Sequence, residues 1–160
     1  MSNATYISTT DTAKAIRKAL KVAFPSVAFS VKSSKYSGGS SISVAWTDGP
    51  TDKEISAVTN KFEGASFDGM TDLKSYQESE YNGQRVQWGA NYVFTNRRYS
   101  ADFLRRRAQD VATRWGFAVP AVIVNEWGGV NVEEDWSIRV GCDTLAAEIM
   151  KKAHRTRAAA

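Results

Sequence analysis

The chain has 160 residues, of which 42% are hydrophobic and 24% are charged, and this composition predicts a folded globule and excludes a disordered segment. A single cysteine excludes an internal disulfide framework, and a single histidine excludes the usual His/Cys metal sites, so we expect no metal and no cofactor. The formal net charge of +4 is a mild bias towards polyanionic partners.

The length predicts one domain over residues 1–160, with flexible ends at residues 1–8 and 155–160. No apolar run approaches the roughly 20 residues that a membrane span requires. Residues 1–6 lack the basic and apolar regions of a signal peptide. We therefore expect a cytoplasmic protein without a membrane partner.

The first elements are a helix and a hairpin. Apolar residues at helical spacing predict a helix over residues 11–24, capped by one of three polar residues, Thr9, Thr10 or Asp11. Strict alternation predicts strands over residues 27–31 and 41–46. Residues 33–40 contain Gly38-Gly39, and we expect them to join the two strands by a loop longer than a tight turn.

The corner Thr47-Asp48-Gly49-Pro50 ends the second strand, since Pro cannot continue a strand ladder. A helix over residues 51–62 follows, with a Thr51/Glu54 capping box and Gly64 as a left-handed cap. Residues 67–72 carry turn chemistry and residues 73–84 give no clear pattern. The longest alternation in the chain predicts one strand over residues 86–95.

The second half predicts a helix from Ser100, its cap, to Gly116, which ends it. A continuous apolar run over residues 119–124 predicts a well-buried strand, and alternation predicts a last strand over residues 136–140. Asp143 is the expected cap of a final helix that leads into a basic tail, residues 151–157. This tail could add affinity for phosphates or simply complement the helix dipole.

The pattern as a whole predicts an α+β fold, with a mainly antiparallel sheet of about five strands and about four helices. Residues 11–47 and 100–140 share the order helix, strand, Gly-Gly loop, strand. This shared order predicts a pseudo-repeat of a helix-hairpin unit, and the alternative is that α+β domains share such an order by chance.

Arginines cluster in and just before the third helix, and helical spacing can present several of them to phosphates. The candidate nucleic-acid-binding residues are Arg97, Arg98, Arg106, Arg107 and Arg114. The alternative is a solvated helix face in which these arginines pair with Asp102 or Asp110.

Four tryptophans are expected in the core: Trp46, Trp88, Trp115 and Trp136. The fifth precedes Gly128-Gly129 in an acidic loop and can anchor a protein partner, because aromatic residues dominate binding hot spots. The candidate partner-binding residues are Trp127, Glu133, Glu134 and Asp135. The alternative is that Trp127 folds back over the end of a strand.

Three carboxylates at turns, Asp48, Asp68 and Asp72, offer a metal-dependent nuclease as a minor hypothesis. Asp before Gly is also ordinary turn chemistry. No catalytic motif accompanies them, and His154 and Cys142 have no partners from which to build a nucleophile. We therefore expect no enzymatic activity and no catalytic residues.

Four segments together resemble a large polyvalent protein-associated domain: residues 24–31, residues 41–51, Phe67-Asp68-Gly69-Met70 and Arg98-Tyr99-Ser100. The resemblance covers residues 6 to about 117. Such domains occur in proteins of phages and conjugative plasmids, so the resemblance implies a mobile-element context and no defined catalytic residues.

The combined interpretation is a non-enzymatic accessory protein of a phage or plasmid that binds nucleic acid through the basic helix. The alternative is a counter-defence or regulatory inhibitor that binds a host protein, such as a nucleic-acid-processing or defence protein.

Overall fold

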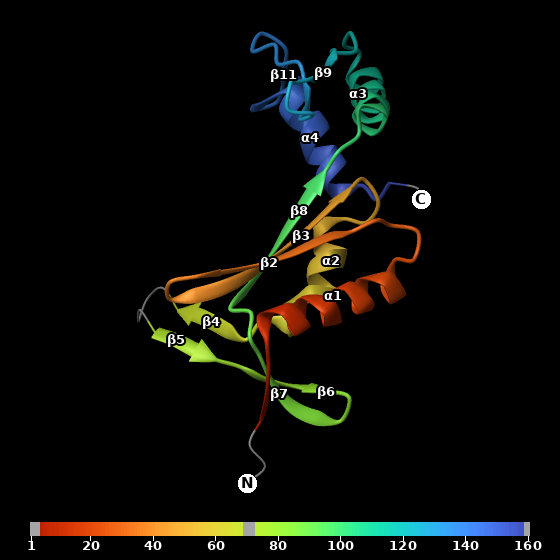
Figure 1. Ribbon diagram of the computed structural model, residues 1–160. Helices are drawn as coiled ribbons and strands as arrows, with labels where there is room; N and C mark the ends of the chain where they lie inside the picture. Colours follow the sequence, from red (N-terminus) through yellow and green to blue (C-terminus); the bar gives the residue numbers. More distant parts are fainter. Residues whose placement is uncertain (1–3, 69–72, 159–160) are drawn as a thin grey trace. The chain divides into compact units, whose positions relative to one another are not determined.

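The computed structural model describes residues 4–68 and 73–158 (Figure 1). The chain divides into two compact units. The first unit is Met1–Trp46 with Asp52–Asn96, and the second unit is Thr47–Thr51 with Arg97–Ala160. Whether residues 1–160 fold as a single domain stays a prediction.

The fold is α+β, and the described residues form four α-helices. Their strands form separate sheets of two or three strands, so the expectation of one sheet of about five strands is wrong. Residues 84–88 and 92–98, which share the one strand expected over residues 86–95, pair in two different sheets. The pseudo-repeat stays a prediction. Among the described residues, no helix has the length and hydropathy to cross a membrane.

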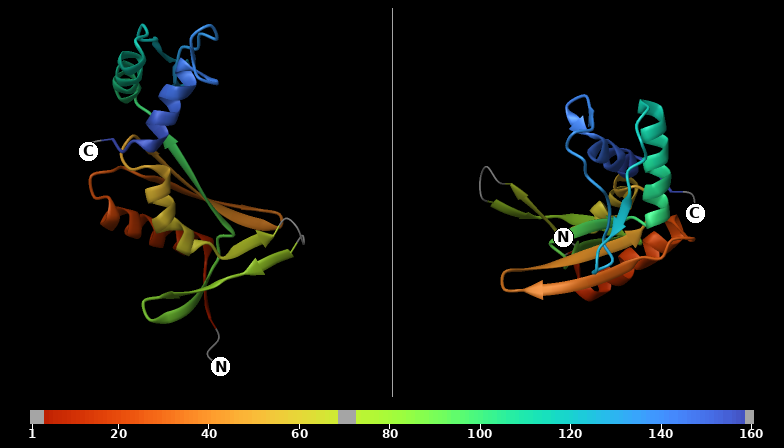
Figure 2. Two further views of the ribbon diagram at one scale, coloured as in Figure 1. Left: turned by 180° about the vertical axis from the view of Figure 1, so that it is seen from behind. Right: turned by 90° about the horizontal axis from the view of Figure 1, so that it is seen from above.

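The first unit begins with a short strand and a helix, and two of its strands, β3 and β8, end in residues that belong to the second unit (Figures 1 and 2). Its elements are β1 Thr5–Ile7, α1 Thr9–Ala23, β2 Ser30–Tyr36, β3 Gly39–Thr47, α2 Asp52–Thr59, the 3-10 helix η1 Asn60–Phe62, β4 Ala65–Asp68, β5 Leu73–Tyr76, β6 Glu78–Tyr81, β7 Gln84–Trp88 and β8 Tyr92–Arg98.

The sheets of the first unit have the orders β1-β7-β6, β2-β3-β8 and β4-β5. β1 runs parallel to β7, whereas β6 pairs with β7 and β2 with β3 in the antiparallel sense. The β2–β3 hairpin is confirmed, but the expected long loop is wrong, because Tyr36 pairs with Gly39 across a two-residue turn. Gly38 supplies the left-handed conformation of this turn, with φ of 86°.

The strand expected over residues 86–95 is two strands, β7 and β8. Gly89 N–H donates to the Ile7 carbonyl over 2.7 Å, which continues the pairing of β7 with β1, and Asn91 N–H donates to the Ser40 carbonyl of β3 over 3.0 Å. Between residues 89 and 91 the chain therefore passes from the sheet that contains β1 to the sheet that contains β3. The polar segment after residue 73, which gave no pattern, contains β5 and β6.

The core of the first unit contains the predicted apolar faces of α1, β3 and α2. Its fully buried members include Ile16, Leu20, Ile42, Val44 and Ile55. Trp46 and Trp88 are also buried, as expected. Gly64 is not a left-handed cap. A Cβ at this position would lie 1.8 Å from the Trp88 carbonyl oxygen, so close backbone approach requires the glycine.

The second unit consists of two helices and two small hairpins. Its elements are α3 Ala101–Trp115, β9 Val122–Val124, β10 Val130–Val132, β11 Arg139–Val140, β12 Asp143–Thr144 and α4 Leu145–Arg155. α3 packs on α4, and β9 pairs with β10 and β11 with β12 in antiparallel hairpins. The core lies between the helices and includes Leu104, Ala108, Val111, Ile149 and Ala153.

The expected caps of α3 are confirmed: Ser100 Oγ accepts from Phe103 N–H, and Gly116 is left-handed with φ of 72°. The caps of α1 and α4 differ from expectation. Ser8 caps α1, and Thr144 caps α4. The Asp143 side chain instead forms an ion pair with Lys151.

The second unit exposes apolar residues that were expected in its core. Ile123 and Val124 are 54% and 55% exposed, so the expected well-buried strand over residues 119–124 is wrong. Trp115 is 52% exposed, because the exposed residues 116–119 leave the last turn of α3 uncovered. Trp136 is 70% exposed, and the strand expected from it begins only at Arg139.

Candidate functional site

The guanidinium group of Arg97 connects two segments of the second unit that are far apart in the sequence. Nε donates to the Asp48 carbonyl over 3.1 Å, and Nη2 donates to the Gly49 carbonyl over 3.0 Å. From the other side, the Ala153 carbonyl accepts from Nη1 over 3.1 Å and the Thr156 carbonyl from Nη2 over 2.9 Å. Arg97 therefore joins the corner at residues 47–51 to the C-terminal end of α4.

Aromatic rings fix the same guanidinium group. Arg97 Cζ lies 5.2 Å from the centroid of the Tyr99 ring and 5.5 Å from that of Phe103, and these two rings are stacked at 5.7 Å. The Tyr99 hydroxyl lies 2.8 Å from His154 Nδ1. With all three nitrogens bonded to carbonyls and rings against its plane, this arginine has a structural role.

The corner that Arg97 contacts is built from left-handed residues, Asp48 with φ of 56° and Gly49 with φ of 58°. Asp48 Oδ1 accepts from the Ser100 N–H over 2.8 Å, and Asp48 N–H donates to the Arg98 carbonyl over 2.8 Å. This is the turn chemistry that Asp-Gly favours. In the described part of the chain, no group of three or more His, Cys, Asp or Glu side chains is placed to hold a metal ion.

The side chains of the other two carboxylates of the nuclease hypothesis are not among those that the structure describes. Asp72 is outside the described residues, and Asp68 ends β4 without a described side chain. The structure therefore gives no geometry for a site that combines them with Asp48.

The Arg107 side chain also contacts other residues of α3. Its side chain is 21% exposed, its Nη2 lies 3.0 Å from Asp110 Oδ2, and its Cζ lies 5.6 Å from the centroid of the Phe103 ring. Its Nε is buried without a hydrogen-bond partner among the described residues. On the same helix, the neighbouring Arg105 pairs with Asp102 over 2.8 Å.

The remaining three candidate arginines, Arg98, Arg106 and Arg114, are exposed. None of their side chains has a hydrogen bond or ion pair with another described residue. The structure thus divides the five candidates into two that are held by the protein and three that are available to a ligand.

The loop between β9 and β10 presents Trp127 to solvent with 84% of its surface exposed. Asn125 shapes this loop, because its Oδ1 accepts from Trp127 N–H over 3.1 Å and from Gly129 N–H over 2.6 Å. The indole therefore does not cover the end of a strand.

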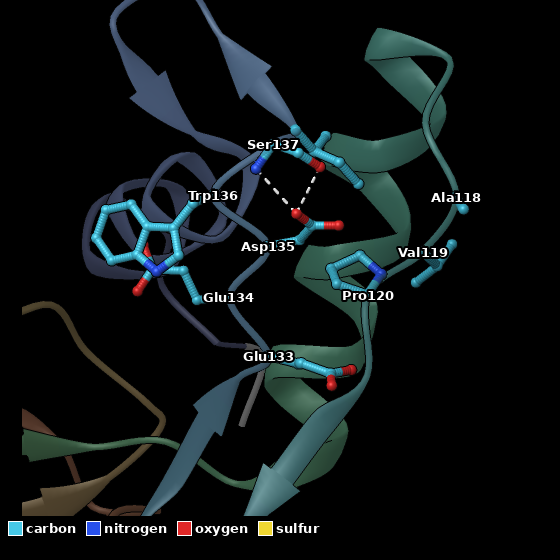
Figure 3. Close-up of a pocket in the computed structure, with 9 residues that line it drawn as sticks. Ala118, Val119, Pro120, Glu133, Glu134, Asp135, Trp136 and Ser137 are labelled. Carbon is cyan, nitrogen blue, oxygen red and sulfur yellow. Dashed lines mark hydrogen bonds between the residues drawn. The ribbon is translucent and has the colours of Figure 1, made fainter.

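The acidic candidates lie in a groove of about 520 Å³ within the second unit (Figure 3). Its lining consists of Ala118, Val119, Pro120, Glu133, Glu134, Asp135, Trp136, Ser137 and Ile138. The structure brings the three acidic candidates together here, whereas Trp127 does not line the groove. Glu134 Oε1 accepts from the Thr144 hydroxyl over 2.9 Å.

Asp135 and Ser137 form a tight turn in the wall of the groove. Asp135 Oδ1 accepts from the Ser137 hydroxyl over 2.6 Å and from its N–H over 2.9 Å, which lowers the pKa of Asp135 below its ordinary value. This turn explains why the expected strand does not begin at Trp136, and it keeps the Asp135 carboxylate ionised.

Sequence reasoning missed Trp136, Val119 and Pro120 as parts of this groove. A signal was present: residues 115–138 contain four acidic residues and no lysine, arginine or histidine. A continuous apolar run instead assigned Val119 and Pro120 to a buried strand, and apolar alternation assigned Trp136 to another strand.

The sequence model of a family described as large polyvalent protein associated domain 29 matches residues 7–100. No curated protein and no solved structure matches the chain. The matched region covers most of the first unit and ends at the residue that caps α3. Arg106, Arg107, Arg114 and the acidic groove lie after it.

Replacing Arg97 with lysine is expected to destabilise the protein, because an ammonium group cannot bond both the corner and the end of α4. We expect the Arg97→Lys variant to lose about 2–3 kcal/mol in the free energy of unfolding, measured by urea denaturation. The control is Arg98→Lys, which we expect to change stability by less than about 0.5 kcal/mol. Equal losses in the two variants would contradict the structural role of Arg97.

Proposed function

Because the chain belongs to the family of large polyvalent protein associated domain 29, we propose that it is an accessory protein of a phage or plasmid that binds nucleic acid. Family membership suggests the association with mobile elements. The nucleic-acid binding is proposed from residues of this chain.

The observation that supports nucleic-acid binding is the availability of Arg98, Arg106 and Arg114. Each is exposed and has no described side chain as partner. Arg106 and Arg114 lie eight residues apart on α3, which places their Cα atoms about 12 Å apart along the helix axis. Guanidinium groups bind phosphate oxygens strongly, and such contacts position a protein on nucleic acid without reading its sequence.

In this proposal Arg97 and Arg107 have supporting roles. Arg97 holds the corner next to Arg98, and Arg107 packs on Phe103 beside Arg106. The acidic residues of α3 limit the strength of binding, since Asp102 and Asp110 lie in the same helix and reduce its positive charge. We therefore expect modest, salt-sensitive affinity.

The expected test is a triple variant, Arg98→Ala/Arg106→Ala/Arg114→Ala, in fluorescence anisotropy with random-sequence duplex DNA across a range of salt concentrations. Loss of three phosphate contacts should lower the slope of log Kd against log salt by about three. The matched control, Lys21→Ala/Lys32→Ala/Lys35→Ala, removes three exposed charges from the first unit and should keep the wild-type slope. Equal slopes in the two triple variants would refute the proposed interface.

A second candidate function is binding of a host protein, as expected of a counter-defence or regulatory inhibitor. The supporting observation is the 84% exposure of Trp127 in a loop whose shape is fixed by Asn125. Large exposed aromatic residues are frequent anchors of protein interfaces. Glu126 beside Trp127 adds negative charge to this loop.

For this second candidate, Trp127→Ala should weaken the complex with a host protein by about tenfold or more without unfolding the chain. Proteins captured from host lysate by the wild type would be identified, and their Kd measured by calorimetry with each variant. Trp115→Ala is the matched control, because it removes another exposed tryptophan of the second unit. An unchanged Kd in Trp127→Ala would exclude the loop as an anchor.

A further inference from the structure

The residues that line the acidic groove of the second unit carry negative charge, so the groove does not suit the phosphates of a nucleic acid. Glu133, Glu134 and Asp135 line it, and its nine lining residues include no lysine, arginine or histidine. Within the described residues, none of these three carboxylates forms an ion pair. The groove therefore carries negative charge without a compensating cation and favours a cationic occupant.

The walls of the groove add apolar surface to this charge. Trp136 is 70% exposed and Val119 is 45% exposed, and both line the groove with Pro120. In Figure 3 the Asp135 carboxylate points towards the Pro120 ring, whereas the Trp136 indole lies on the other side of the segment that carries both residues. A side chain that fits must combine an apolar stem with a positive head, and arginine has both, together with a planar group that stacks on indole.

We propose that this groove binds a short arginine-bearing segment of a partner protein. The stem of the arginine packs on Pro120, and its guanidinium group meets the carboxylates of Glu133 and Asp135. Another side chain of the same segment packs on the Trp136 indole. The volume of about 520 Å³ accommodates a few residues and no folded domain. This inference goes beyond nucleic-acid binding; it names the partner chemistry for the second candidate function and rests on that candidate.

The three carboxylates of the groove differ in how many hydrogen bonds they already accept from the protein. Asp135 already accepts two hydrogen bonds from Ser137, and Glu134 accepts one from Thr144. The Glu133 side chain has no described partner and is exposed. Glu133 is therefore the carboxylate whose removal should cost the most affinity with the least change in the protein itself.

The probe is a fluorescein-labelled octapeptide that alternates arginine and valine, with a matched peptide that has glutamate in place of arginine. Anisotropy at low salt should give a Kd in the micromolar range for the arginine peptide and no binding of the glutamate peptide. We expect Glu133→Gln to weaken binding about fivefold and Trp136→Ala about tenfold. Glu126→Gln, which removes an exposed carboxylate outside the groove, should stay within about twofold.

Two further variants separate this proposal from the others. The Arg98→Ala/Arg106→Ala/Arg114→Ala variant should bind the arginine peptide as the wild type does. Trp127→Ala should also bind it normally, because Trp127 does not line the groove. A peptide that still binds when Trp127→Ala has lost the host protein would show that the groove functions and that the loop is a separate anchor.

The proposal is overturned if the arginine peptide fails to bind at millimolar concentration, or if Glu133→Gln and Trp136→Ala bind it as tightly as Glu126→Gln. A second copy of the chain is the other occupant that carries arginines. A dimer in analytical ultracentrifugation that both Glu133→Gln and the triple arginine variant abolish would assign the groove to self-association and overturn the partner-protein proposal. Circular dichroism confirms that each variant is folded.

Discussion

Five backbone carbonyls that converge on one guanidinium group are the constraint on which the second unit depends. Arg97 bonds to the carbonyls of Asp48 and Gly49 on one side and to those of Ala153, His154 and Thr156 on the other. The carbonyls of Ala153 and His154 lie in the last turn of α4, where few backbone N–H groups are left to bond them and where positive charge is favourable. A half-buried arginine therefore supplies hydrogen bonds to the end of α4 and attaches the corner to it.

The candidate arginines fall into two groups: some are bonded to the protein itself, and the others are available to bind a ligand. Arg97 and Arg107 are held by carbonyls, rings or a carboxylate, whereas Arg98, Arg106 and Arg114 are left to solvent. Negative charge gathers elsewhere in the second unit, in a groove without a cation. The second unit thus offers two surfaces of opposite charge, and most of it follows the region that the family model matches.

Local patterns predicted much of the fold because they depend on neighbours in the sequence. The burial of Ile42 and Val44 follows from alternation, and the caps Ser100 and Gly116 follow from residue chemistry.

The features that the sequence did not predict depend on contacts between residues far apart in the chain. The break between β7 and β8 depends on pairing with distant strands, since β7 pairs with β1 and β8 with β3. Trp136 has the apolar alternation of a core residue, yet it is 70% exposed, because no described helix or strand of the small second unit covers it. The arginine cluster was visible in the sequence, but its division into held and available members required the structure.

The measurement that tests this division most directly is nitrogen-15 NMR of the arginine side chains during titration with duplex DNA. The Nε–H of Arg97 should exchange slowly with water, because it is bonded to the Asp48 carbonyl, and its resonance should not move when DNA is added. The resonances of Arg98, Arg106 and Arg114 should exchange rapidly in the free protein and shift on binding. A DNA-dependent shift of Arg97 as large as that of Arg98, or three unmoved resonances at Arg98, Arg106 and Arg114, would contradict the division of roles.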